Sequence, residues 1–322
     1  MENLDFINYY IPSDDDYFDL VSGLKDINQK KLNSKYFYDK KGSELFEKIT
    51  NLSEYYPTKK ELEILNKKNY DLKKNLPSNS VVVEFGSGSI KKIKKLLEIL
   101  NKPEEYISID ISKEFLFDNA KKLANCYPDL KITAICADFN QTLKLSKIIN
   151  KKKSIIGFFP GSTIGNFNPT NAKKLLNRFS KIIGLENYLL VGVDLKKNKQ
   201  IIEKAYNDTE GITAQFNKNI LLRINKKYGT KFNLENFSHK AFFNSKEDRI
   251  EMHLLSKKKQ NIKVLNQEIL IQKGETIHTE VSYKYSIKAF KNLAKNAGYD
   301  ILDVLTDSQK YFGVFILKVV NS

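Results

Sequence analysis

Five short apolar runs follow one another between residues 80 and 194, and amphipathic stretches of helical length separate most of them. Each run ends in a turn that contains an acidic residue or glycine. Strands that alternate with helices in this way predict a parallel α/β sheet. The predicted strands are residues 81–83, 106–110, 132–136, 154–159 and 188–193.

The sequence before residue 80 predicts two helices. Residues 1–35 are polar, and we expect them to be irregular. A helical pattern begins near Ser43 and is broken by the Tyr-Tyr-Pro sequence at 55–57. Thr58 is expected to cap the second helix, because Glu61 follows three residues later as in a capping box.

After residue 197 the periodicity changes. Residues 200–227 predict helix, residues 240–285 predict strand pairs with polar turns, and residues 286–297 predict helix again. Two final strands, 301–305 and 311–320, are expected to complete the sheet as an antiparallel edge. The simplest architecture is one α/β core interrupted by an insertion.

Composition limits the class of protein. The chain has 322 residues, of which 41% are hydrophobic, enough for a sizeable core. No apolar stretch approaches the ~18 residues of a transmembrane helix. The first twenty residues carry six acidic side chains and no Lys or Arg, the opposite of a leader peptide, so we expect a cytoplasmic protein without a membrane partner. Two cysteines and three histidines without ligand spacing predict neither a disulfide framework nor a metal site.

The net charge of +16 leaves two interpretations open. A basic surface can bind nucleic acid, which makes an RNA-binding or RNA-modifying protein one hypothesis. The basic residues are nearly all Lys, however, and they are spread through short runs beside many Asn and Ile. That distribution is more typical of a compositional bias on solvated faces, so we expect no nucleic-acid partner.

The sequence VVVEFGSG at 81–88 predicts a nucleotide-type ligand site. Gly86 and Gly88 permit close approach of a ligand to backbone, and the next helix offers its N-terminus. Asp110 closes the second strand, where an acidic residue binds ribose hydroxyls. Asp138 and Phe139 end the third strand and suit an adenine edge and face. The third glycine of the dinucleotide fingerprint is missing, which favours S-adenosylmethionine over a pyrophosphate ligand; a bare strand–helix turn is the alternative.

Two further patterns are candidates for substrate binding. FFPGSTIGNF at 158–167 offers backbone at Gly161 and the amide of Asn166, or is a simple glycine-rich turn. Glu280 and Ser282 project from one face of a predicted strand, because the side-chain period is two. Together they can contact two polar atoms of one ring, although solvent-facing polar residues on an ordinary strand give the same pattern.

Seven longer blocks make a more specific resemblance. The chain resembles the L-histidine Nα-methyltransferases of ergothioneine biosynthesis, which use S-adenosylmethionine to trimethylate the α-amine of histidine and give hercynine. The matching blocks lie in family order over nearly the whole chain: YFYDKKGSELFEKITNLSEYYPTKKELEIL, VVEFGSGSIKK, FFPGSTIGNF, LLVGVDLKK, AYNDTEGITAQFN, RIEMHLLS and GETIHTEVSYKYS. The glycine loop departs from the family at Ser89–Ile90, where two small hydroxyl residues are expected.

The resemblance implies a role for each matching residue. It implies cofactor binding by Gly86, Lys92, Asp110, Asp138 and Phe139. It implies that the amino-acid backbone of the substrate is held by Asn166 and Tyr206, with Tyr38 and Gly161 lining the same region. It implies an imidazole pocket made of Tyr55, Met252, Glu280 and Ser282. Of these residues, Tyr38 and Asn166 are the expected catalytic pair: Asn166 would help fix the carboxylate and amine of the substrate, and Tyr38 would steady the reacting nitrogen or help its proton leave.

The resemblance also implies an architecture. The expected fold is α/β, a class I S-adenosylmethionine-dependent methyltransferase with a Rossmann-like seven-stranded sheet and an inserted α+β substrate-binding domain. The expected methyltransferase core is residues 60–197 plus 286–322, and the substrate-binding domain is 1–59 plus 198–285. We expect a monomer that acts on a small molecule. An Nα-methyltransferase for another aromatic amino acid such as tryptophan is the alternative.

Overall fold

The computed structural model describes residues 2–10, 15–100, 102–141, 143, 145, 148–149 and 152–321. The chain divides into two compact units. The core unit comprises Met1–Tyr10, Tyr56–Lys197 and Ser282–Ser322, and the insert unit comprises Ile11–Tyr55 and Asn198–Val281. The predicted division assigns residues 1–10, 56–59 and 282–285 to the substrate-binding domain. In the structure they lie in the core unit.

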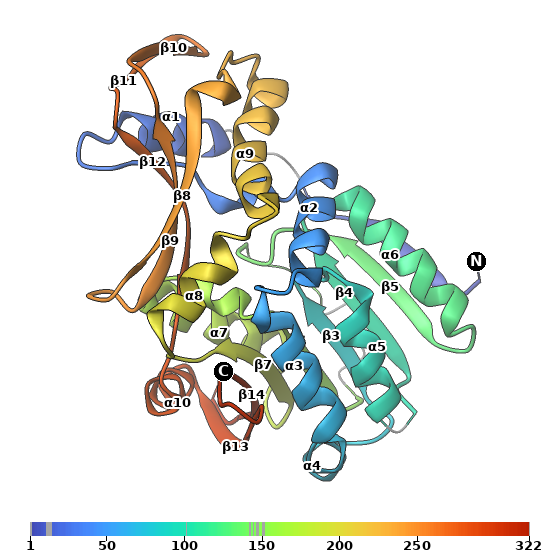
Figure 1. Ribbon diagram of the computed structural model, residues 1–322. Coiled ribbons are helices and arrows are strands. Elements are labelled where there is room, and N and C mark those ends of the chain that lie inside the picture. Colours follow the sequence, from blue (N-terminus) through green and yellow to red (C-terminus); the bar gives the residue numbers. More distant parts are fainter. Residues whose placement is uncertain are drawn as a thin grey trace. The chain divides into compact units, whose positions relative to one another are not determined.

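A mixed sheet of eight strands forms the centre of the core unit, in the order β1-β5-β4-β3-β6-β7-β14-β13 (Figure 1). The strands are β1 Leu4–Asn8, β3 Val81–Phe85, β4 Glu105–Asp110, β5 Lys131–Cys136, β6 Ile155–Phe159, β7 Tyr188–Asp194, β13 Tyr299–Thr306 and β14 Phe312–Val319. β14 pairs antiparallel with both β7 and β13, while β1 to β7 of this sheet pair in parallel. Apart from β1, this is the strand order of a class I methyltransferase, as predicted.

Two predictions are wrong at the N-terminus. The residues of β1 form a strand where an irregular segment is expected, and this strand makes the sheet eight-stranded instead of seven-stranded. β1 pairs in parallel with β5 at the edge, from Leu4 opposite Ile132 to Asn8 opposite Cys136. The five residues LDFIN have too little alternation to predict a strand from periodicity. Within 15–35 the structure also has helix α1 (Asp15–Lys25), strand β2 (Lys30–Lys31) and the start of the 3-10 helix η1 (Ser34–Phe37).

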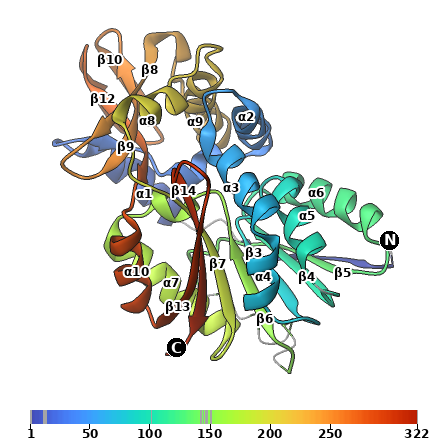
Figure 2. The same ribbon diagram turned by 60° about the horizontal axis from the view of Figure 1, so that its bottom comes forward.

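Helices cover both faces of this sheet (Figure 2). α3, α4, α5 and α6 pack successively against one another, and α7 packs against α10. Their bounds are α3 Tyr56–Lys67, α4 Asn69–Asn75, α5 Ile90–Ile99, α6 Lys113–Cys126, α7 Pro169–Ile183 and α10 Ile287–Lys295, with η2 at Thr163–Asn166. The prediction that Thr58 caps α3 is wrong: the helix begins at Tyr56, and Pro57 fits its first turn because the N–H that proline lacks has no helical partner there.

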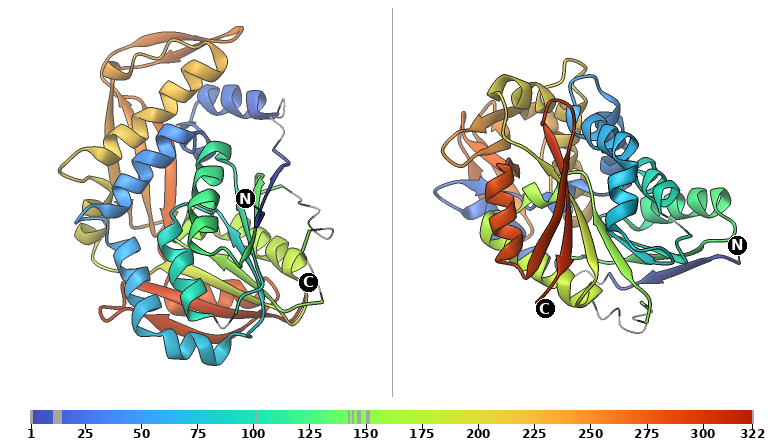
Figure 3. Two further views of the ribbon diagram at one scale, coloured as in Figure 1. Left: turned by 90° about the vertical axis from the view of Figure 1, so that its right-hand side faces the viewer. Right: turned by 90° about the horizontal axis from the view of Figure 1, so that it is seen from below.

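The insert unit contains a four-stranded sheet in the order β2-β12-β9-β8 and a two-stranded sheet β10-β11 (Figure 3). Its remaining elements are α2 Lys40–Asn51, α8 Lys199–Tyr206, α9 Ile212–Tyr228, η3 Leu234–Asn236, β8 Phe237–Asn244, β9 Arg249–Ser256, β10 Gln260–Val264, β11 Gln267–Ile271 and β12 Thr276–Tyr283. The last two residues of β12 belong to the core unit.

The single helical stretch predicted for 200–227 is two helices. α8 ends at Tyr206 with Asn207 as its C-cap, and Gly211, whose backbone is left-handed with φ of 70°, directly precedes α9. The carboxylate of Asp208 accepts hydrogen bonds from the N–H groups of Ile212 (2.7 Å) and Thr213 (2.8 Å), and so satisfies donors of the first turn of α9. Among the described residues, no helix is long and apolar enough to cross a bilayer.

Candidate active site

The glycine loop of the core unit follows a completely buried strand. β3 ends at Phe85, and the N–H of Gly86 donates to Ile109 O at 2.8 Å, which ties the loop to β4. Gly86 has φ of 76°, and a Cβ added there would lie 3.5 Å from the ring of Phe139. No atom of the described residues lies within 4 Å of a Cβ added at Gly88. The loop therefore leaves backbone accessible beside the Phe139 ring, as a ligand cradle requires.

Asp110 is the last residue of β4, and Asp138 lies two residues after the end of the neighbouring strand β5. Asp110 O accepts the N–H of Ala137 at 3.0 Å, so the two strand ends lie side by side. Burial raises the pKa of the Asp110 carboxyl to about 7, against hydrogen bonds from the N–H groups of Ser112 and Ile111. A poorly hydrated carboxylate is stabilised by hydroxyl donors. Gly86, Asp110, Asp138 and Phe139 thus fit a nucleoside-containing cofactor at the carboxyl edge of the sheet.

Lys92 lies on α5 and forms a buried ion pair that sequence reasoning missed. Its Nζ is 2.6 Å from Glu61 Oε2, and the Glu61 side chain is fully buried. The N–H of Gly161 donates to both oxygens of Glu61, at 3.0 and 3.1 Å. Glu61 therefore joins a predicted cofactor residue to a predicted substrate residue. An acidic residue on the buried face of a helix is the only signal of this role in the sequence.

A second missed carboxylate lies inside the glycine strand. Glu84 interrupts the apolar sequence VVVEF and is 1% exposed. It accepts a hydrogen bond from the hydroxyl of Tyr106, which also lies 3.1 Å from Ser87 Oγ. Burial raises the pKa of Glu84 to about 7. Because Ser87 belongs to the glycine loop, this network holds the loop against β3 and β4.

The loop after β6 is packed closely against the end of β12. Gly161 and Ser162 both have positive φ, 79° and 59°, and η2 follows with Asn166 as its last residue. A Cβ added at Gly165 would lie 3.0 Å from Ser282 Oγ and 2.9 Å from Tyr283 O. Only glycine permits this approach. The predicted substrate residues Asn166 and Ser282 are therefore brought to the same region of the core unit.

Asp194, at the end of β7, is the centre of a buried polar network behind this loop. Its carboxylate accepts hydrogen bonds from the Tyr56 hydroxyl at 2.8 Å and from the ammonium of Lys197, and it lies 2.7 Å from Lys284 Nζ. Burial alone would raise the pKa of Asp194, but the charges of Lys284 and Lys197 outweigh burial and lower it. Lys284 Nζ also lies 2.9 Å from Ser282 Oγ. These residues lie within the family-like blocks of the sequence, but their pairing is not visible there.

In the insert unit, the three predicted tyrosines belong to one aromatic cluster. The ring of Tyr55 packs edge-on against Tyr206 (6.3 Å between centroids) and against Phe46 (6.1 Å). Tyr38 packs against Phe46 at 6.3 Å and against Phe216 at 6.2 Å. The three tyrosines for which the resemblance implies a role toward the substrate therefore lie in one aromatic cluster within this unit.

A chain of hydrogen bonds links this cluster to the sheet that carries Met252 and Glu280. Tyr206 O lies 2.8 Å from His239 Nε2, and His239 Nδ1 lies 2.9 Å from Asn217 Nδ2. Thr279 Oγ1 donates to Asn217 Oδ1 at 2.7 Å and lies 3.0 Å from Met252 O. Buried polar networks of this kind hold side chains in one arrangement.

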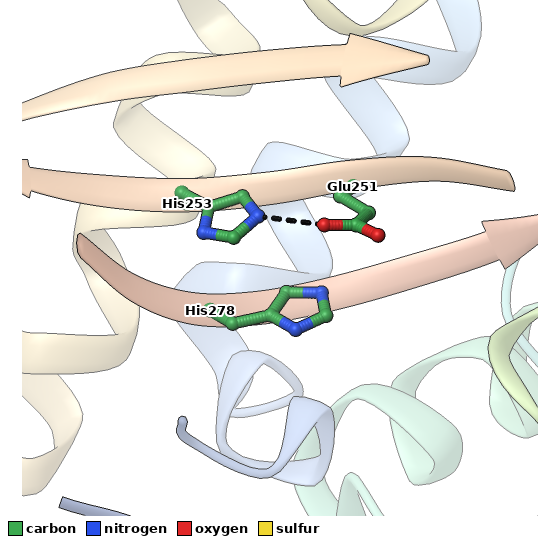
Figure 4. A group of neighbouring side chains, drawn as sticks. All are labelled: Glu251, His253 and His278. Carbon is green, nitrogen blue, oxygen red and sulfur yellow. Dashed lines mark hydrogen bonds and ion pairs between the residues drawn. The ribbon is translucent and has the colours of Figure 1, made fainter. Parts of the chain in front are cut away.

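A separate cluster on β9 and β12 contains Glu251, His253 and His278 (Figure 4). His253 Nε2 lies 3.0 Å from Glu251 Oε2, and His278 Nε2 lies 3.1 Å from Glu280 O. The imidazole rings are stacked, 4.5 Å apart with planes 7° from parallel. Nitrogen lone pairs lie in the ring planes, so in this arrangement they do not converge on one ion. Burial lowers the pKa of both rings, that of His278 to about 4.

The carboxylate of Glu251 makes most of the hydrogen bonds of this cluster of three side chains. Arg249 Nε and Asn244 Nδ2 donate to its Oε1 at 2.8 and 2.9 Å. Burial alone would raise the pKa of Glu251, but hydrogen bonds from Asn244, His253 and Arg249 lower it to about 2. The cluster fixes the backbone of β12 next to Glu280.

The predicted site residues are divided between the two units. Those of the core unit are Gly86, Lys92, Asp110, Asp138, Phe139, Gly161, Asn166 and Ser282, and those of the insert unit are Tyr38, Tyr55, Tyr206, Met252 and Glu280. Within each unit the structure brings most of them together, and it adds Glu61, Glu84, Asp194 and Lys284 as supporting residues.

Known proteins resemble this chain over most of its length. A histidine N-alpha-methyltransferase of Mycobacterium tuberculosis is 35% identical over 301 residues, 92% of each chain. Ergothioneine biosynthesis protein 1 of Neurospora crassa is 30% identical over 294 residues, which cover 85% of this chain and 32% of that protein. A solved S-adenosylmethionine-dependent methyltransferase from Clostridium acetobutylicum superposes with a TM-score of 0.45 and 12% identity, covering 80% of this chain and 90% of that one. Residues 16–319 match the family model described as "Histidine-specific methyltransferase, SAM-dependent". The chain therefore belongs to the histidine-specific, S-adenosylmethionine-dependent methyltransferases.

Proposed function

We propose that this protein transfers methyl groups from S-adenosylmethionine to the α-amino nitrogen of L-histidine, up to the trimethylated betaine hercynine. The observation that carries the proposal is the family match over residues 16–319, on a chain whose cofactor-type residues meet at one sheet edge. Tryptophan as the substrate is not favoured, because the relative that is 35% identical over nearly its full length is named for histidine.

The cofactor supplies an electrophilic methyl group on a sulfonium. The substrate nitrogen would have to be presented to this methyl group in its neutral form with a free lone pair, so one proton would be lost to water before each transfer. In this proposal Asp110 accepts the ribose hydroxyls, Asp138 and Phe139 contact the adenine, and Lys92 binds the carboxylate of the cofactor. Gly86 lets the cofactor approach the backbone.

The chain's contribution to the reaction is mainly positioning. Asn166 and Tyr206 would hold the carboxylate and amine of histidine, and Tyr38 would steady the reacting nitrogen. Well-oriented reactants gain up to ~7–11 kcal/mol relative to reactants free in solution. Tyr55, Met252, Glu280 and Ser282 would contribute to the imidazole pocket, and the insert unit would supply the first three of these residues.

We also propose that the protein works as a cytoplasmic monomer on the free amino acid, without a nucleic-acid or membrane partner. The basic residues that give the net charge of +16 are almost all Lys. Arg is preferred where phosphate is recognised by bidentate contacts. This distribution supports a solvated basic surface.

The test is methyl transfer to each of the twenty amino acids, followed by product mass. We expect three added methyl groups on histidine and none on the other nineteen. A folded RNA serves as a parallel acceptor, and S-adenosylmethionine without acceptor is the blank. Turnover on tryptophan instead of histidine, or on RNA alone, would overturn the proposal.

A further inference from the structure

The structure determines the direction of the hydrogen bond between Lys284 and Ser282. Lys284 Nζ lies 2.9 Å from Ser282 Oγ, and the Lys284 side chain is fully buried. An ammonium has three N–H donors and no acceptor, so Ser282 Oγ must accept. The hydrogen of the Ser282 hydroxyl therefore points elsewhere. Because Ser282 is 3% exposed, that hydrogen needs an acceptor other than bulk water.

The buried group next to Ser282 contains two ammonium groups and only one carboxylate. Lys284 and Lys197 both pair with the single carboxylate of Asp194, and the side chains of all three are at most 3% exposed. The group carries one net positive charge in a poorly hydrated place, where charge interactions are strong. This charge opposes a cation next to Ser282, while the carboxylate of Glu280 favours one. The charges therefore do not select the form of the ring, and the direction of the Ser282 hydrogen bond does.

We propose that Lys284 makes Ser282 a hydrogen-bond donor and thereby restricts the site to the neutral imidazole form of histidine. The inference rests on the proposed function, in which Glu280 and Ser282 contact the ring. A neutral imidazole has one N–H and one lone-pair nitrogen. Glu280 accepts from the N–H, and Ser282 donates to the lone pair. An imidazolium has two N–H groups, one of which would face the Ser282 hydrogen and the positive cluster. Lys284 is a positioning residue that acts through Ser282.

The test measures binding, because the α-amine of the substrate also titrates during turnover. Histidine is titrated calorimetrically into the protein saturated with S-adenosylhomocysteine, at pH 5.5 and at pH 7.5. With a ring pKa of about 6.5, the neutral fraction falls about tenfold between these values. We expect the Kd of histidine to rise about tenfold at pH 5.5. The Kd of 1,2,4-triazol-3-yl-alanine, whose ring stays neutral at both values, should change less than twofold.

Two variants separate the effect of Lys284 from a general effect of charge. Lys284→Met lets the Ser282 hydroxyl turn and accept, so the pH ratio for histidine should fall from about tenfold to below threefold. Lys197→Met removes one ammonium from the same cluster, but the contacts of Lys197 are with Asp194, Tyr56 and Leu195 O and leave the bond to Ser282 intact. This control keeps Ser282 a donor but removes the excess positive charge, so the ratio should stay near tenfold if the hydrogen bond selects the neutral ring. A ratio that falls as far as in Lys284→Met would assign the selection to charge and contradict the inference. Binding of S-adenosylhomocysteine reports whether each variant is folded.

The outcomes distinguish the inference from the proposed function. Equal or tighter binding of histidine by the wild-type protein at pH 5.5 would overturn the inference and leave histidine as the substrate. Failure of histidine to bind at either pH, with S-adenosylhomocysteine bound, would overturn the proposed function instead. If Lys284→Met does not fold, Ser282→Ala replaces it, since loss of the donor should also reduce the ratio; an unchanged tenfold ratio in that variant contradicts the inference.

Discussion

Glu61 and Lys92 form an ion pair of 2.6 Å that also receives the N–H of Gly161, and the carboxylate is completely buried. The pair joins α3 to α5, and its carboxylate also binds the loop that follows β6. One carboxylate thereby fixes a predicted cofactor residue and a predicted substrate-lining residue in the same unit.

Removing the charge of Glu61 should destabilise the protein strongly. Glu61→Gln leaves the Lys92 ammonium without its counter-charge, and breaking one side of a buried pair costs ~3–5 kcal/mol. Urea unfolding measures the loss. The double variant Glu61→Gln/Lys92→Met should regain part of the stability, because no unpaired charge remains. Additive losses in the double variant would show that the pair is not coupled.

The two glycines of the loop after β3 should respond differently to alanine. Gly86→Ala imposes a side chain at φ of 76° and next to the Phe139 ring, and should lower the free energy of unfolding by about 1–2 kcal/mol. Gly88→Ala is the matched control, since its Cβ meets no atom of the described residues within 4 Å. It should change stability by less than about 0.5 kcal/mol. Equal losses in the two variants would refute this difference between the glycines.

Asp110 should lower stability at neutral pH in the absence of cofactor. Its folded-state pKa is raised from 3.8 to about 7, so the folded protein binds more protons than the unfolded chain in this window, and stability falls as pH rises through it. Asp110→Asn should therefore gain stability relative to wild type between pH 4 and pH 8, by on the order of 2–4 kcal/mol. The same variant should bind S-adenosylhomocysteine about tenfold to a hundredfold more weakly. A stability difference that is the same at both pH values would contradict a raised pKa of this partly buried carboxyl.

The side chain of His278 should make the free energy of unfolding fall as the solution becomes acidic. Its folded-state pKa is lowered from 6.5 to about 4, so the unfolded chain binds more protons, and stability present above pH 6.5 is lost as pH falls. This group accounts for about 2 kcal/mol of loss between pH 7 and pH 5. His278→Phe, which preserves a flat ring for stacking on His253, should lose less stability over that range than wild type does. Parallel denaturation curves for the two proteins at both pH values would exclude this role.

Glu280→Ala should reduce the affinity for histidine more than the affinity for cofactor. Loss of a hydrogen-bond partner in a buried site typically costs ~1–3 kcal/mol, or about fivefold to 150-fold in Kd. Calorimetry with histidine and with S-adenosylhomocysteine separates the two affinities, and turnover of tryptophan measures selectivity. A variant with the wild-type preference for histidine over tryptophan would remove Glu280 from the imidazole pocket.

Short-range patterns predict the sheet and much of the cofactor edge. The apolar runs of β3 to β7 are long enough to be recognised as strands, and Gly86, Asp110 and Asp138 mark their ends. The weak strand β1 escapes such patterns because it is an edge strand without alternation. The helix α3 begins two residues before the predicted cap. The prediction is wrong because Thr58 and Glu61 have the spacing of a capping box without forming one at the helix start.

The sequence by itself determined the alternation of strands and helices, the glycine turn and the family, because these depend on residues near one another in the chain. Only the tertiary structure decided which charges pair. Lys92 with Glu61, and Lys284 with Asp194, are far apart in sequence and meet through the order of the sheet and its covering helices. The energy of a buried charge depends on its three-dimensional surroundings, so no local pattern encodes these partners.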